Sequence, residues 1–75
     1  MADTKRIMYT LQKALKQKGI IIPITEQQFY SEEQNRFITM YIVKHNKQQI
    51  RTASQLKVIE YLKGKLEESR KEIHN

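Results

Sequence analysis

The residues best suited to covalent chemistry in this 75-residue chain are three serines and two histidines. A serine nucleophile needs a base within hydrogen-bonding reach, usually oriented by a third group. None of the serines lies in a GxSxG turn, and His45 and His74 stand at the predicted end of a strand and near the end of the chain. The paired carboxylates Glu32 and Glu33 fall in a predicted turn, where water solvates both. The sequence therefore predicts a protein that is not an enzyme.

Cofactor and metal sites are not predicted either. Gly19 and Gly64 are the two glycines and stand far apart, so neither a P-loop nor a GxGxxG turn is present. The chain has no cysteine, which excludes disulfides and thiolate ligands. His45 and His74 have no third ligand at the spacing of a metal motif.

The formal net charge of +6 is concentrated in two blocks. Five cations and one carboxylate leave +4 in residues 1–18, and four cations without a carboxylate leave +4 in residues 37–57. Such a balance favours an anionic partner, either nucleic acid or an acidic protein. The cations predicted to bind it are Lys13, Lys16, Arg36, Lys44, Lys47, Arg51 and Lys57.

The segment 44–51 is the more specific of these two signals. Its cations can pair with phosphates, Gln48 and Gln49 can hydrogen-bond them, and the N-terminus of a following helix would add backbone donors. The alternative interpretation is a solvated loop that is merely basic.

A first helix is predicted over residues 4–18, because apolar residues recur there on one helical face. Asp3 or Thr4 can cap its N-terminus, and Gly19 can adopt the left-handed conformation that ends a helix.

Residues 27–31 and 36–44 predict the two strands of a hairpin, with a turn at residues 32–35 in which Asn35 can adopt a positive φ. A third short strand is predicted at residues 20–24, where isoleucines favour an extended backbone and Pro23 restricts the strand to an edge. Asn46 and Lys47 open a polar loop.

A second helix follows a predicted capping box at residues 52–55, in which Thr52 caps and Gln55 reaches back. Gly64 lies inside this helix, where it marks either a break or a close backbone approach. The helix is expected to fray near His74. Its apolar stripe consists of Leu56, Ile59, Leu62, Leu66 and Ile73.

These elements predict a single small α+β domain over residues 1–75, with both helices on one face of an antiparallel sheet. A core of this size usually needs help from a metal, disulfides or a partner chain, so we expect a homodimer.

The sequence leaves open which face of the main strand meets the helices. If Ile38, Met40 and Ile42 point inward, a second face with Phe37 and Tyr41 remains, either to bind nucleic acid or to be covered by a second protomer. The residues of the predicted dimer interface are Phe37, Tyr41, Ile59, Leu62 and Leu66.

The first six residues are polar and predict no secretory signal, and no apolar run approaches the ~18 residues of a membrane span. We therefore expect a cytoplasmic protein. Two functions remain open: a nucleic-acid-associated accessory or regulatory protein, and an interaction module that acts on an acidic protein as an adaptor or inhibitor. Small, basic chains without catalytic residues are typical of accessory proteins encoded by phages and mobile elements, although no residue motif supports that origin.

Overall fold

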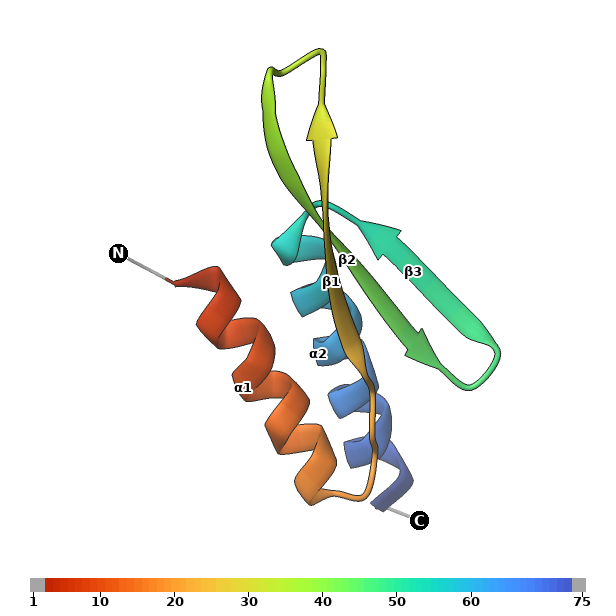
Figure 1. Ribbon diagram of the computed structural model, residues 1–75. Helices are drawn as coiled ribbons and strands as arrows, with labels where there is room; N and C mark the ends of the chain where they lie inside the picture. The colour runs from red at the N-terminus through yellow and green to blue at the C-terminus, as the bar shows by residue number, and fades with distance from the viewer. Residues whose placement is uncertain (1–2, 74–75) are drawn as a thin grey trace.

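The chain folds as a helix, a three-stranded antiparallel sheet and a second helix, as the computed structural model of residues 3–73 shows (Figure 1). The predicted α+β class is therefore confirmed. The elements in chain order are α1 (Thr4–Gln17), β1 (Ile24–Ser31), β2 (Arg36–His45), β3 (Gln48–Thr52) and α2 (Gln55–Ile73).

Helix α1 begins and ends where the local signals placed it. The carboxylate of Asp3 accepts a hydrogen bond from the backbone N–H of Arg6 at 3.2 Å, which makes Asp3 the N-cap. After the last helical residue, Gly19 adopts a φ of +84°, a conformation that costs glycine little.

The sheet has the order β1-β2-β3, so β2 is central and the other two strands are edges. Asn35 in the first turn and Asn46 in the second adopt φ values of +52° and +56°, as asparagine often does in tight turns. The positive φ predicted for Asn35 is confirmed. Both pairings run without a break in register, from Ile24 opposite Val43 in the first to His45 opposite Gln48 in the second.

The third strand was predicted in the wrong segment. Residues 20–23 form no strand, because Ile22 inserts its side chain into the core and its carbonyl accepts a hydrogen bond from Gln12 Nε2 at 2.9 Å. The third strand is instead β3, in the segment predicted as a polar loop. A two-residue turn after His45 folds it back on β2, where Ile50 packs against the core as its single large apolar residue.

Helix α2 begins two residues later than the predicted capping box. Ser54 is the N-cap, since its hydroxyl accepts a hydrogen bond from the N–H of Lys57 at 3.3 Å. Thr52 instead accepts from the N–H of Ser54 at 3.0 Å, and Gln55 hydrogen-bonds across to other elements. Gly64 neither breaks the helix nor meets a neighbour, because a Cβ placed there would contact nothing within 4 Å. His74 lies outside the described residues.

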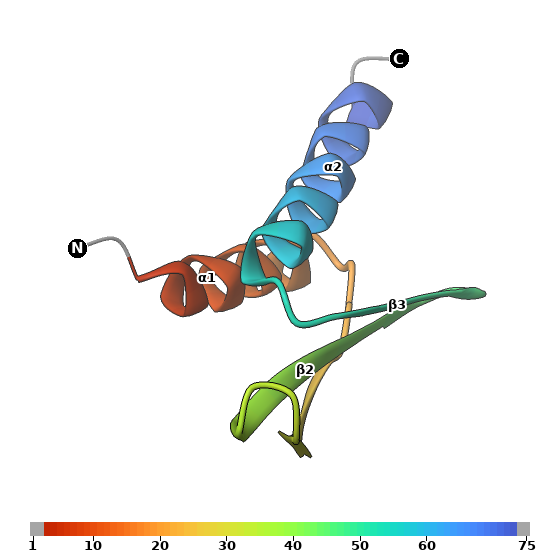
Figure 2. The same cartoon turned by 90° about the horizontal axis from the view of Figure 1, so that it is seen from above.

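Both helices lie on one side of the sheet and pack on each other, with α2 closer to β2 and β3 (Figure 2). The core forms between the helices and one end of the sheet. Its buried members are Met8, Leu15, Ile22, Tyr41, Val43, Val58, Ile59 and Leu62.

The face of β2 that packs on the helices is the one with Tyr41 and Val43, so the arrangement with Ile38, Met40 and Ile42 inward is wrong. Register supplies the reason, because Val43 lies between Ile24 and Ile50 in a fully apolar row across the sheet. Residues directly opposite in antiparallel strands share a face. We call this side of the sheet the inner face.

Three of the residues predicted at a dimer interface lie in the core of the single chain instead. Tyr41, Ile59 and Leu62 are buried among the core side chains, so the prediction that they contact a second protomer is wrong. Leu66 is half-buried against the same core, whereas Leu56, at the start of the predicted stripe, is exposed. The stripe on α2 thus serves mainly to pack α2 against the rest of the domain.

The far end of the β1–β2 hairpin projects beyond both helices (Figure 1). Here Tyr30 and Phe37 pack edge to face, with ring centroids 5.3 Å apart, yet both remain largely exposed. Phe37 is 69% exposed and, of the residues predicted at a dimer interface, is the one that the fold leaves most open to contact.

Candidate functional site

Three of the predicted cations occupy strand positions that alternate with those of the inner face, and we call this set of positions the open face. Arg36 and Lys44 stand near the two ends of β2 and belong to the same set, because they are eight positions apart. Arg51 joins them from β3, where it lies opposite Ile42. All three side chains are exposed, and Arg36 donates from Nε to Gln34 Oε1 at 3.0 Å.

Apolar side chains occupy the open face between these cations. Ile38, Met40 and Ile42 alternate along β2 and are half-buried, and Phe29 of β1, opposite Ile38, is 44% exposed. Lys44 is eight positions after Arg36, which corresponds to ~27 Å of strand. The open face is therefore an apolar stripe with a cation near each end and a third cation beside it.

The open face has no carboxylate. Across residues 24–52, the one acidic residue within a strand is Glu26, which shares the inner face with Tyr41. The remaining positions of the open face are polar and uncharged, and they are Thr25, Gln27, Ser31 and Gln49. Every charge carried by the strand positions of this face is therefore positive, while Glu32 and Glu33 lie in the turn beside Arg36.

The other predicted cations are not brought together with these three. Lys47 lies in the turn between β2 and β3, and Lys57 is exposed on the first turns of α2. The prediction that segment 44–51 leads directly into a helix N-terminus is wrong, because β3 occupies most of it and α2 begins only at Gln55. Lys13 and Lys16 lie on α1, on the helical side of the sheet (Figure 2).

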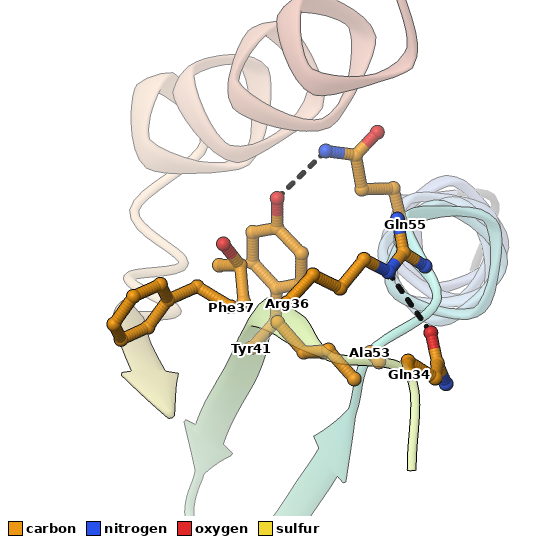
Figure 3. A pocket seen from close by; sticks show the side chains of 8 residues that line it. Gln34, Arg36, Phe37, Tyr41, Ala53 and Gln55 are labelled. Atoms are coloured by element: carbon orange, nitrogen blue, oxygen red, sulfur yellow. Dashed lines mark hydrogen bonds between the residues drawn. The ribbon is translucent and has the colours of Figure 1, made fainter. Parts of the chain in front are cut away.

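A hollow of about 390 Å³ opens beneath the projecting hairpin, between the inner face and the start of α2 (Figure 3). Arg36 and Ile38 line this hollow together with Tyr41, so near the tip of the hairpin the open-face positions also border the helical side of the sheet. The Tyr41 hydroxyl accepts a hydrogen bond from Gln55 Nε2 at 2.6 Å. The Oε1 of Gln55 in turn accepts from the hydroxyl of Thr4, so this network joins β2, α2 and the first turn of α1. Because Gln55 is committed at both ends, we interpret this network as structural.

Helix α1 is also joined to β1 through a titratable pair. The hydroxyl of Tyr9 donates to Glu26, and Lys5 Nζ lies 3.3 Å from the same carboxylate. Burial and the hydrogen bond to Glu26 raise the pKa of Tyr9 to about 12. The hydrogen bond from Tyr9, followed by the contact with Lys5, lowers the pKa of Glu26. The contact thus favours a protonated Tyr9 hydroxyl and an ionised Glu26 carboxylate, the two states that form the hydrogen bond. This is expected for a contact that stabilises the fold.

A second hollow of about 390 Å³ lies against the C-terminal half of α1. Lys13 and Lys16 flank it, and Ile21, which is 67% exposed, contributes apolar surface. This hollow is a basic surface separate from the open face. Its lining residues are Tyr9, Gln12, Lys13, Lys16, Ile21 and Ile22.

Among residues 3–70, whose side chains the structure describes, no group of three or more histidine or acidic side chains could hold a metal ion. His45 lies at the end of β2, near Lys65 and Ser69, and its buried Nδ1 makes no hydrogen bond to the described residues.

None of the helices in residues 3–73 has the length and apolar character needed to span a bilayer. Comparisons of the chain with protein-family models, curated proteins and solved structures give no match.

Phe29 is the residue of the open face that sequence reasoning missed. The segment around it was predicted to be extended, but its pairing partner was not, and a strand's side chains change faces with a one-residue shift in register. Its position opposite Ile38 follows from the four-residue turn between Ser31 and Arg36. Counting residues from Ile38 back across this turn would have predicted Phe29 as its partner on β1.

Proposed function

We propose that the chain binds single-stranded nucleic acid on the open face of its sheet, as a nucleic-acid-associated accessory or regulatory protein. The observation that carries this proposal is one set of alternating strand positions with three exposed cations, an apolar stripe and no carboxylate. Cations pair with backbone phosphates, while an aromatic ring and apolar side chains provide contact area for unstacked bases.

The assignment of roles follows from chemistry and position. Arg36 and Arg51 present planar guanidinium groups suited to bidentate contacts with phosphate, and Lys44 adds a point charge. Phe29 is the aromatic side chain of the open face and the candidate for stacking on a base. A single aromatic ring and no fixed pattern of donors favour binding with little sequence preference.

The proposal is tested by fluorescence anisotropy with a labelled single strand of about 15 nucleotides. The test variant combines Arg36→Gln, Lys44→Gln and Arg51→Gln, and the matched control combines Lys13→Gln, Lys16→Gln and Lys63→Gln on the helices. Both lose three charges, so the net charge is the same. We expect the open-face variant to lose at least about tenfold in affinity at low salt and the control to lose much less.

Salt dependence gives a second measure of the same contacts. Each phosphate neutralised on a single strand contributes a slope of about −0.7 to log K against log salt, so three contacts contribute about −2. The open-face variant should lose that part of the slope. Equal losses in both triple variants would contradict a dedicated surface, and no binding by the natural chain at micromolar concentration would contradict the function itself.

The second hollow favours a second candidate function, in which an acidic protein partner binds beside α1. Lys13 and Lys16 flank exposed apolar surface there, a combination suited to an acidic segment with apolar side chains. Capture from the native cytoplasm after nuclease treatment tests it. A partner that is retained by the open-face variant and lost with Lys13→Glu and Lys16→Glu would favour this function, and loss of all captured protein with nuclease would contradict it.

A further inference from the structure

The outer edge of β1 is the longest unpaired backbone edge in the structure. β1 has eight residues and pairs on one side alone, with β2, in an unbroken register. Within residues 3–73, the backbone of β1 makes no backbone hydrogen bonds other than those of this ladder. About half of its N–H and C=O groups therefore point away from the sheet without a partner.

This edge has few of the features by which monomeric proteins protect such strands. Edge strands are usually short, interrupted by a bulge or proline, marked by lysine, or given an inward-pointing charge. β1 is eight residues long with no bulge, proline or lysine, and its one inward-pointing charge, Glu26, is paired with Lys5 and accepts a hydrogen bond from Tyr9. β3, the opposite edge, has five residues and an exposed arginine.

We propose that two copies of this chain pair through their β1 strands, in antiparallel orientation, to form a continuous six-stranded sheet. A two-fold axis perpendicular to the sheet relates the two copies and places all four helices on one side. Two-fold dimers are the commonest closed assemblies, and the pairing removes the longest free edge from both copies.

Two central registers give the pairing its greatest overlap. Opposite residues must share a face, so the axis passes at a residue, and the overlap of the two β1 strands is largest with the axis at Gln27 or at Gln28. In the first register Glu26 lies opposite Gln28 of the second copy, and in the second it lies opposite Tyr30. Neither places like charges opposite each other, so the strand is compatible with a copy of itself.

Pairing would also join the two open faces into one surface. The positive surface described above would double in area, with Phe29 of each copy close to the axis. The dimer rests on backbone geometry and does not depend on the proposed binding of nucleic acid, so each can fail without the other.

Engineered cysteines test the interface directly, because the natural chain has none. Residues opposite each other have Cβ atoms ~5 Å apart, close enough for a disulfide after small movements. Under mild oxidation without nucleic acid, Gln27→Cys or Gln28→Cys should cross-link into a dimer, while the control Gln49→Cys on β3 should stay largely monomeric. Equal or greater cross-linking of Gln49→Cys would overturn the proposal.

A second variant tests the same interface without oxidation. A residue on the two-fold axis faces itself, so Gln27→Lys together with Gln28→Lys places two ammonium groups opposite each other in either register. Sedimentation equilibrium should show a dimer for the natural chain at hundreds of micromolar and a folded monomer for this variant. The control, Gln48→Lys with Gln49→Lys on β3, should remain dimeric. A monomeric natural chain, or a double-lysine variant that stays dimeric, would overturn the proposal.

Discussion

The two faces of the sheet use neighbouring residues of one strand for different purposes. On the inner face, Tyr41 is 3% exposed and Val43 is buried beside it, both in contact with the helices. On the open face, Met40 and Ile42 lie between cations, are half-buried and are not part of the core. The comparison teaches that the apolar run 37–43 is not one core segment, because Tyr41 and Val43 are buried in the core while Met40 and Ile42 lie outside it.

The difference follows from the rows that the strands form. The inner row Ile24–Val43–Ile50 is apolar throughout, and burying it costs no hydrogen bonds. The open row Thr25–Ile42–Arg51 contains a cation that must stay in water. Helices that covered the open face would have to bury Arg51, which explains why they lie on the other side.

The largest expected effect on stability comes from comparing a lysine substitution on the inner face with one on the open face. Tyr41→Lys would bury an unpaired charge, at a cost of about 3–5 kcal/mol. The whole chain has a stability of only ~4–11 kcal/mol at 0.05–0.15 kcal/mol per residue, so this variant should be largely unfolded by circular dichroism. Met40→Lys on the open face should stay folded, because a lysine at this half-buried position can extend its ammonium group into water. If Met40→Lys unfolds and Tyr41→Lys does not, the assignment of the faces is wrong.

A smaller effect on stability is expected from a substitution that stabilises α2 and changes neither face of the sheet. Gly64 is exposed in the interior of α2, and a Cβ there meets nothing within 4 Å. Gly64→Ala should raise the free energy of unfolding by about 1 kcal/mol, as read from urea titration, because alanine loses less backbone entropy in a helix. Nucleic-acid affinity should not change. A loss of stability would mean that a neighbour outside this structure contacts Gly64.

The smallest effect concerns the contact between α1 and the inner face. Tyr9→Phe removes the hydrogen bond to Glu26 and should cost less than about 1 kcal/mol, because water reaches the pair. When Tyr9→Phe is added to the variant with Gln27→Lys and Gln28→Lys, the oligomeric state of that variant should not change.

The Tyr9–Glu26 hydrogen bond should be recognisable from the pH dependence of its contribution to the free energy of unfolding. The Tyr9 pKa rises from 10.0 to about 12, so its contribution is complete below pH 10 and is lost as pH rises through 12. The Glu26 pKa is lowered from 4.5, so its contribution is present above pH 4.5 and is lost as pH falls through the folded-state pKa. The stability difference between the natural chain and Tyr9→Phe should therefore be constant near neutral pH and shrink at both extremes. A difference that grows at either extreme would contradict the hydrogen bond.

The sequence by itself determined the local elements. Helix α1 with its Asp3 cap and Gly19 end, the turn at Asn35 and the strand from Arg36 follow from signals within a few residues of each feature. Such signals act through local backbone conformation and short-range hydrogen bonds, and they need no information about the rest of the chain. The basic character of residues 37–57 was likewise readable from composition.

Only the tertiary structure decided which surfaces those elements form. Strand β3 has one large apolar residue, so its pairing depends on β2 and not on its own pattern. The face of β2 was ambiguous because both alternating sets are apolar, and the partners supplied by β1 and β3 resolved it. The same registers placed Phe29, Arg36, Lys44 and Arg51 on one face, since strand pairing joins residues that are distant in sequence and are invisible to periodicity.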